Sequence, residues 1–178
     1  PDRIRALWQD TEIYSLGGAT EASIWSIYYH IREVDPTWPS IPYGRPMNNQ
    51  TFYVLDDHLQ PCPTWVVGEL YIGGDGLAAG YWKDEVKTNA HFFIHPTNGE
   101  RLYKTGDLGR YLPNDDTHTL PNIEFLGRED FQVKIRGHRI ELGEIETQLL
   151  QHGAVREVVV NAVGDPKGNR QLIADIVI

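Results

Sequence analysis

Two short stretches of the sequence combine residue types that could bind a nucleotide and a metal ion. Residues 18–21, Gly-Ala-Thr-Glu, place backbone amides that can approach an anion beside a hydroxyl and a carboxylate. The hydroxyl of Thr20 could bind a phosphate oxygen, and the carboxylate of Glu21 is a ligand type that Mg²⁺ prefers. Residues 103–108, Tyr-Lys-Thr-Gly-Asp-Leu, predict a tight turn that presents the carboxylate of Asp107. Each stretch by itself is also typical of an ordinary turn or helix cap.

A third stretch, residues 127–146, carries charges of both signs at close spacing. It reads GREDFQVKIRGHRIELGEIE, with Arg128, Lys134, Arg136 and Arg139 among five acidic residues. Such a mixture is typical of a solvated strand face, and that interpretation stays open beside a role in binding an anion.

Short strands must position the first two stretches. Residues 51–57 and 68–74 are β-rich runs that end in turn residues, so we expect two paired strands. Residues 22–31 predict a strand or buried segment, and residues 84–93 have helical spacing of their apolar positions. Residues 101–112 predict a strand, a turn and a second strand.

The last third of the chain changes character. Residues 131–136 alternate apolar and polar side chains, which indicates a half-buried strand. A turn and a short strand follow, and residues 142–149 show the period of an amphipathic helix. Residues 155–164 and 171–178 predict two more strands. The expected fold class is therefore mixed α/β, with a β-β-α-β-β lobe that begins between Gly127 and Asp130.

Composition narrows the classes of function. The net charge of −9 argues against a nucleic-acid partner, because a phosphate backbone requires a basic face. No apolar run reaches 18 residues, so we expect no membrane partner. A single cysteine, Cys62 between two prolines, suits a structural thiol in a reducing compartment, and we expect a cytoplasmic location.

Taken in order, the stretches resemble the later motifs of adenylate-forming enzymes, and specifically the adenylation domains of nonribosomal peptide synthetases. Residues 17–21, GGATE, are similar to the aromatic-Gly-Pro-Thr-Glu motif of that family. Residues 68–82, GELYIGGDGLAAGYW, and residues 103–108, YKTGDL, resemble two further motifs, and residues 127–146 resemble a fourth.

The resemblance implies a function and its partners. Such domains bind ATP and Mg²⁺, convert an amino acid to an aminoacyl-adenylate, and pass the acyl group to the phosphopantetheine thiol of a peptidyl carrier protein. By position in the motifs, the resemblance implies catalytic roles for Thr20, Glu21 and Lys134, with Glu21 as the metal ligand, and ATP or AMP contacts for Gly18, Ala19, Thr20, Asp107, Phe125 and Arg128. Asp107 would hold the ribose hydroxyls.

The resemblance also implies two lobes. Residues 1–129 would be the distal part of the large N-terminal lobe. Residues 130–178 would begin an incomplete small C-terminal lobe. Asp130 would be the hinge about which this lobe rotates, bringing Lys134 and Gly137 toward the site.

The sequence departs from the family pattern at three positions. Gly17 stands where relatives carry the aromatic residue that stacks on adenine, Ala19 stands for the usual proline, and Trp65 replaces a frequent glycine. Adenine stacking must then rest on Phe125 or on a residue that the motifs do not identify. These changes resemble the cysteine-activating domains of siderophore and thiazoline synthetases.

By alignment with the family, Leu16, Ile24 and Trp25 should line the pocket for the amino-acid side chain. An apolar wall suits the thiol of cysteine better than a hydroxyl, which requires a hydrogen-bond partner. Serine or a small apolar acid remains the alternative substrate. The alternative structural interpretation is that Ile24 and Trp25 are core residues.

Several family motifs are absent from the 178 residues, among them the phosphate loop and the motif with the catalytic lysine. We therefore expect a fragment of a longer protein that shows no pyrophosphate exchange alone. Another domain could be inserted after Ile178, as in several relatives. Two other functions remain as alternatives: an acyl-CoA synthetase or aryl-acid ligase of the same superfamily, and a non-catalytic scaffold.

Overall fold

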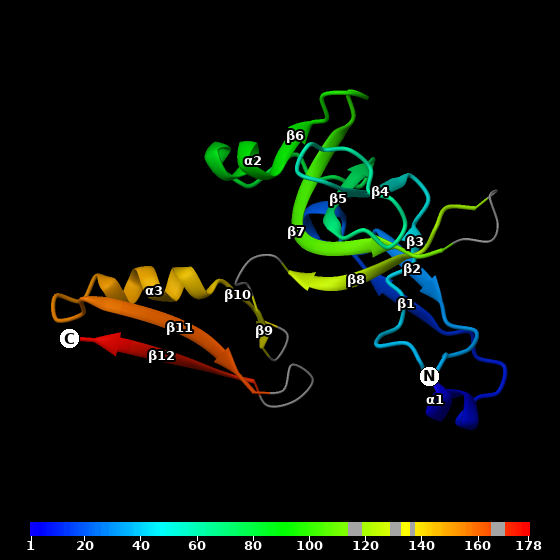
Figure 1. Ribbon diagram of the computed structural model, residues 1–178, viewed down its shortest axis with the longest axis horizontal. Coiled ribbons are helices and arrows are strands. Elements are labelled where there is room, and N and C mark those ends of the chain that lie inside the picture. The colour runs from blue at the N-terminus through cyan, green and yellow to red at the C-terminus, as the bar shows by residue number, and fades with distance from the viewer. Residues whose placement is uncertain (114–118, 129–132, 136–137, 165–169) are drawn as a thin grey trace. The chain divides into compact units, whose positions relative to one another are not determined.

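Two units make up the fold in a computed structural model, which describes residues 1–113, 119–128, 133–135, 138–164 and 170–178 (Figure 1). The first unit is Pro1–Gly127 and the second is Arg128–Ile178. The mixture of sheets and short helices confirms the predicted fold class.

The main sheet of the first unit is antiparallel and is ordered β4-β5-β7-β6, with β8 also paired to β7. Its strands are β4 (Gln50–Leu55), β5 (Gly68–Gly74), β6 (Phe92–Ile94), β7 (Arg101–Tyr111) and β8 (Ile123–Arg128). The predicted pairing of β4 with β5 is confirmed, with Phe52 opposite Ile72 and Val54 opposite Leu70.

One face of this sheet carries most of the core. Val54, Leu70, Ile72, Tyr103 and Ile123 are each at most 1% exposed and belong to one apolar cluster. β5 is buried along most of its length, because β4 and β7 flank it on both edges. β5, the strand that pairs with the segment carrying Asp107, is therefore held in place by a neighbouring strand at each edge.

A smaller antiparallel sheet carries the Gly-Ala-Thr-Glu stretch. It contains β1 (Tyr14–Gly17), β2 (Ile27–His30) and β3 (Arg45–Pro46), and it follows the helix α1 (Asp2–Leu7). The 3₁₀ turn η1 (Thr20–Ala22) lies in the connection from β1 to β2. The prediction of a strand or buried segment over residues 22–31 is wrong in its first half. Ser23 and Ile24 have φ of 61° and 72°, which a strand does not allow, and residues 23–25 are exposed.

The helix α2 (Glu85–His91) confirms the helical prediction for residues 84–93 in its first part. Asp84 caps its N-terminus by accepting a hydrogen bond from the backbone N–H of Lys87 at 2.9 Å. The helix ends at His91, and Phe92 begins β6. Val86 is 84% exposed, so the apolar spacing in the sequence does not mark a buried face here.

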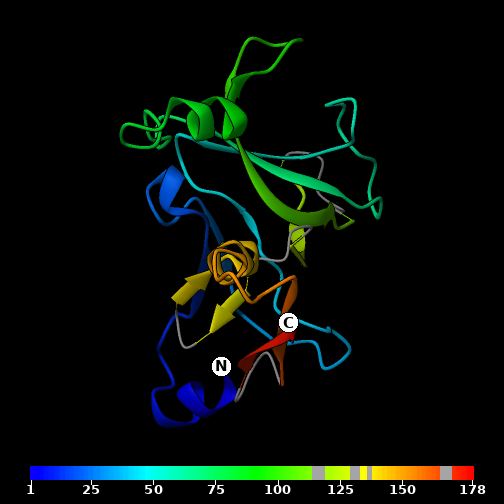
Figure 2. The same ribbon diagram turned by 90° about the vertical axis from the view of Figure 1, so that its left-hand side faces the viewer.

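The second unit confirms the predicted β-β-α-β-β order. Its strands are β9 (Val133–Ile135), β10 (His138–Ile140), β11 (Glu157–Val163) and β12 (Gln171–Val177), with the helix α3 (Leu142–Leu150) before β11. The helix lies alongside β11 in both views (Figures 1 and 2). Val133, Leu142 and Val160 form the buried centre of this unit.

The helices that the structure describes are short. None of the described helices is both long enough and apolar enough to cross a membrane.

Candidate functional site

A bulge in β7 presents Asp107. Leu108 pairs with Glu69 and Lys104 pairs with Tyr71, so the three residues 105–107 oppose Leu70 alone. Gly106 has a φ of 72°, a left-handed conformation that glycine adopts without strain. The sequence predicted a turn between two strands at this point, which is wrong. β7 instead runs continuously from Arg101 to Tyr111, and the extra residues are accommodated within it.

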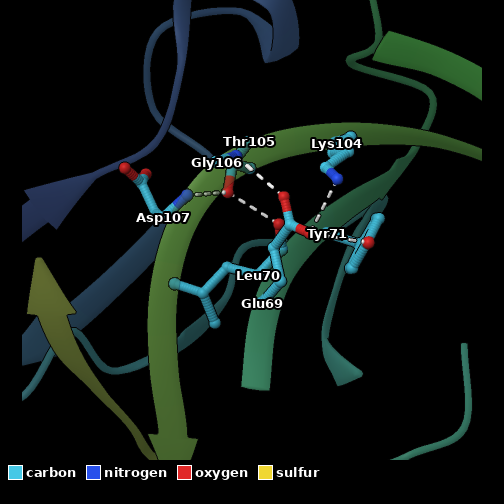
Figure 3. Close-up of polar contacts among 7 residues, drawn as sticks. All are labelled: Glu69, Leu70, Tyr71, Lys104, Thr105, Gly106 and Asp107. Atoms are coloured by element: carbon cyan, nitrogen blue, oxygen red, sulfur yellow. Dashed lines mark hydrogen bonds and ion pairs between the residues drawn. The ribbon is translucent and has the colours of Figure 1, made fainter. Parts of the chain in front are cut away.

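Thr105 holds the bulge in shape from inside the sheet. Its side chain is buried, and its hydroxyl donates to the backbone oxygen of Leu70 at 2.6 Å while accepting from the N–H of Asp107 at 2.9 Å (Figure 3). The N–H of Gly106 donates to Glu69 Oε1 at 3.2 Å. These contacts fix the backbone on which the carboxylate of Asp107 is carried.

Glu69 is itself held on two further sides. Tyr71 Oη donates to Glu69 Oε2 at 2.9 Å, and Lys104 Nζ lies 3.2 Å from the same oxygen. Because the Lys104 side chain is 45% exposed, this ion pair contributes little to stability. The carboxylate of Asp107 points away from this group (Figure 3). Glu69 therefore supports the backbone of the bulge, while the carboxylate of Asp107 points away from Glu69.

Substituting Thr105 tests this arrangement. Thr105→Val keeps the shape of the side chain but leaves the buried Leu70 carbonyl without its hydroxyl donor, so the free energy of unfolding should fall by about 1–3 kcal/mol. Urea unfolding measures the change. Thr105→Ser, which keeps the hydroxyl, is the control and should lose less. Equal losses in the two variants would show that the methyl group, and not the hydroxyl, matters.

Gly18 is connected to the ring of Tyr43. Its backbone N–H donates to Tyr43 Oη at 2.9 Å. Its φ is 138°, and an added Cβ would fall 2.7 Å from both the backbone oxygen of Ile24 and the backbone nitrogen of Ser26. The position therefore requires glycine. Its amide is bonded to a tyrosine in this structure, whereas the sequence suggested an amide open to an anion.

Tyr43 lies close to three of the residues that were predicted to bind the nucleotide. Its ring centroid lies 5.5 Å from that of Phe125 and 6.0 Å from that of Phe52. Burial, together with the nearby Asp107 carboxylate, raises the pKa of Tyr43 to about 12. Gly18, Asp107 and Phe125 thus share one neighbour that the motifs did not identify. No spacing in the sequence connects Tyr43 with these residues, because all three lie far from it along the chain.

The raised pKa of Tyr43 predicts how stability depends on pH. The folded state keeps the phenolic proton above the ordinary value of 10.0, so the unfolded state binds fewer protons and stability falls as pH rises from about 10 to about 12. A shift of two pKa units corresponds to about 2–3 kcal/mol at most. Urea unfolding at pH 9 and pH 11 should show about half of this loss, about 1.4 kcal/mol, and Tyr43→Phe should reduce it. An identical loss in the variant would exclude Tyr43 as its source.

Glu21 lies in the 3₁₀ turn as a buried carboxylate, only 8% exposed. Tyr81 Oη donates to its Oε1 at 2.8 Å, and the backbone oxygen of Glu21 accepts from the N–H of Ala78 at 2.8 Å. Burial and this hydrogen bond raise the pKa of Tyr81, so the phenol remains a donor. The neighbouring Thr20 is exposed. A fixed carboxylate beside an exposed hydroxyl fits a Mg²⁺ ion that is held mainly by phosphate oxygens.

The described residues contain no group of three or more His, Cys, Asp or Glu side chains that could hold a metal ion together. A site for Mg²⁺ here would therefore take one protein carboxylate and depend on a bound nucleotide for the rest of its ligands.

The residues predicted to line the substrate pocket are exposed. Leu16 is 43%, Ile24 is 63% and Trp25 is 57% exposed, so the interpretation of Ile24 and Trp25 as core is wrong. These three residues line neither the hollow beside His95 nor the hollow beside Trp65. Three large apolar side chains thus remain available for contact with a ligand.

Trp65 has a structural explanation. Its φ is 70°, a left-handed conformation that glycine adopts without strain and a tryptophan does not. The guanidinium of Arg110 lies 4.8 Å from the Trp65 ring and donates to Glu124 at 2.6 Å. The cation–π contact offsets part of the backbone strain.

Except for Ala19, the remaining predicted residues lie at or beyond the end of the first unit. Arg128 ends β8 and is the first residue of the second unit. Asp130 and Gly137 lie outside the described residues, as does the side chain of Lys134. Ala19 precedes η1, where its backbone oxygen accepts from the N–H of both Ala22 and Ile24 at 2.9 Å.

Cys62 behaves as a structural thiol. It is buried and free, and burial raises its pKa, which disfavours the reactive thiolate.

Comparison with known proteins gives a consistent set of matches. The model of the AMP-binding enzyme family matches residues 1–82. Bacitracin synthase 1 of Bacillus licheniformis is 48% identical over 177 residues, which are 99% of this chain and 3% of that protein. Pyochelin synthetase PchF of Pseudomonas aeruginosa is 50% identical over 165 residues, which are 93% of this chain and 9% of that protein.

A solved structure extends the match to the fold. It is a holo nonribosomal peptide synthetase protein containing adenylation and PCP domains, bound to a vinylsulfonamide inhibitor, with a TM-score of 0.82 and 27% identity over 98% of this chain and 30% of that chain. The chain thus spans less than a third of each of these proteins. Residues 1–82 thus match the AMP-binding enzyme family, and nearly the whole chain is similar to nonribosomal peptide synthetases, among them one that contains an adenylation domain.

Proposed function

We propose that the protein activates an amino acid with ATP and transfers it to a carrier protein. The observation that carries this proposal is the bulge that holds Asp107 beside Tyr43, because a fixed carboxylate can accept both hydroxyls of a ribose. The similarity to synthetases that contain adenylation and carrier domains supports it.

The chemistry has two steps. A carboxylate oxygen of the amino acid attacks the α-phosphorus of ATP, and pyrophosphate leaves with the electron pair of the broken P–O bond. The phosphopantetheine thiol of the carrier then releases its proton to solvent, and its sulfur attacks the acyl carbonyl carbon. The bond from that carbon to the phosphate oxygen breaks, and AMP leaves with its electron pair. Mg²⁺ would neutralise charge on the phosphate oxygens during the first step.

In this proposal, each site residue has one task. Thr20 binds an α-phosphate oxygen, Glu21 holds the metal ion, and Asp107 accepts the ribose hydroxyls. Phe125 packs near the base and Arg128 lies near the ribose and phosphate. Gly18 and Ala19 shape the backbone that approaches the nucleotide.

The second unit would be the start of the mobile small lobe. Residues 130–178 would rotate about Asp130, and Lys134 would face the site during transfer to the thiol. Residues 1–129 would stay fixed as part of the large lobe.

Cysteine is the proposed substrate. The 50% identity to a pyochelin synthetase supports this choice. So do the exposed aliphatic side chains of Leu16 and Ile24, which offer no hydrogen-bond partner for a serine hydroxyl, and the largely apolar ring of Trp25. A hydroxyl buried against such a wall would lose its bonds to water without replacement.

The test is amino-acid-dependent exchange of labelled pyrophosphate into ATP by the full-length protein, with each of the twenty amino acids. Cysteine should give the fastest exchange, with serine roughly tenfold or more below it. Another best substrate would overturn the cysteine assignment alone. Exchange that requires no amino acid, or no exchange with any, would overturn the proposed function and favour a scaffold or a ligase of another acid.

A further inference from the structure

The ring of Tyr43 occupies the space that a side chain at position 17 would need. A Cβ built on Gly17 would clash with that ring, lying 2.7 Å from its Cζ. Gly17 is not among the glycines in a left-handed conformation, so its backbone does not itself demand glycine. The constraint on this position is therefore the neighbouring ring.

Tyr43 is held firmly in this place. Its hydroxyl accepts from the N–H of Gly18 at 2.9 Å, and Phe52 meets its ring edge-on at a centroid distance of 6.0 Å. Phe125, which is 39% exposed, lies 5.5 Å from it at an interplanar angle of 51°. Two aromatic rings from different parts of the first unit thus form one wall.

A carboxylate stands close to this wall. Asp107 is near enough to Tyr43 to act on its hydroxyl electrostatically, and the bulge in β7 fixes the backbone of Asp107. A nucleoside has a flat base joined to a sugar with two neighbouring hydroxyls. Aromatic side chains bind the face of a base, and a carboxylate binds the hydroxyls.

On the basis of the proposed function, we propose that Tyr43 and Phe125 form the wall against which the nucleotide base packs. Tyr43 thereby supplies the ring that position 17 lacks. Gly17 is glycine because a side chain there would displace Tyr43. The two positions form a coupled pair, in which one ring can be provided from either side.

The first experiment distinguishes contacts with the base from contacts with the sugar phosphate. Binding of AMP and of ribose 5-phosphate to the full-length protein is measured by calorimetry, with ATP-dependent exchange as a second readout. Tyr43→Leu should weaken AMP binding by about tenfold to a hundredfold. Ribose 5-phosphate has no base, so its affinity should stay unchanged. Tyr43→Phe keeps the ring and should stay within about threefold of the parent for AMP.

The second experiment tests the coupling by exchange of the ring. Gly17→Tyr alone should weaken AMP binding, because the new side chain collides with Tyr43. The double variant Gly17→Tyr with Tyr43→Leu should bind AMP at least about tenfold more tightly than Gly17→Tyr alone. Tyr14→Leu is the matched control, because it removes an exposed tyrosine from β1, the strand that ends at Gly17. This variant should bind AMP as the parent does.

The outcomes are distinct. A parent protein that binds no AMP would refute the proposed function itself. AMP binding in the parent together with unchanged binding in Tyr43→Leu would refute the role of Tyr43 alone. Equal losses of AMP and ribose 5-phosphate in Tyr43→Leu would assign it a merely structural role, and a failure of the double variant to recover binding would refute the coupling.

Discussion

Asp107→Asn should raise the KM for ATP in pyrophosphate exchange by on the order of a hundredfold, because two charge-assisted hydrogen bonds to the ribose would become weaker neutral ones. The change keeps the size of the side chain, and the backbone N–H that Thr105 accepts remains in place. The fold of the bulge should therefore survive, and the loss should appear in ATP binding. Steady-state exchange with the full-length protein measures it.

The matched control is Asp57→Asn, an exposed acid in the turn after β4. It removes the same charge from the chain and should leave the KM for ATP unchanged. An equal effect of the two substitutions would assign the loss to net charge. An unchanged KM in Asp107→Asn would remove Asp107 from the nucleotide site.

Leu70→Ala should lower the free energy of unfolding by about 2–5 kcal/mol, the largest stability effect that we predict. Leu70 is fully buried in the main core cluster, and it lies on β5 directly opposite the bulge. Removal of its side chain leaves a cavity that the flanking strands cannot close without shifting the bulge. Urea unfolding followed by tryptophan fluorescence measures the change.

Leu7→Ala serves as the control for the loss of methyl groups. Leu7 is 71% exposed at the end of α1, so its truncation should change stability by less than about 0.5 kcal/mol. A similar small change in Leu70→Ala would mean that the interior beneath the bulge is not packed as described.

Much of the fold could be predicted from local patterns. The β-rich runs of residues 51–57 and 68–74, with turn residues at their ends, predicted two paired strands, and the change of period after Gly127 predicted the order of the second unit. The first prediction succeeded because β-branched and aromatic residues between turn residues favour strands, and the second because burial of one face imposes a period of two on a strand and of 3.6 on a helix. Local patterns failed where the chain leaves that periodicity, as at Ser23 and Ile24.

The residues of the candidate site divide in the same way, into those that local motifs identified and those that such motifs missed. Thr20, Glu21 and Asp107 were predicted as site residues from short motifs, since each motif places a polar side chain close to a glycine. Tyr43 was missed because its partners, Gly17 and Phe125, lie far from it along the chain. No spacing rule connects residues that meet only after the sheets have formed.

By itself, the sequence determined which residue types could bind a nucleotide, the order of most elements, and the absence of an aromatic residue at Gly17. The tertiary structure alone decided that residues 105–107 form a bulge within one strand, because this depends on the register of β7 against β5. It also decided which ring fills the space beside Gly17. Register and packing are set by contacts between distant segments, and a single sequence does not record them.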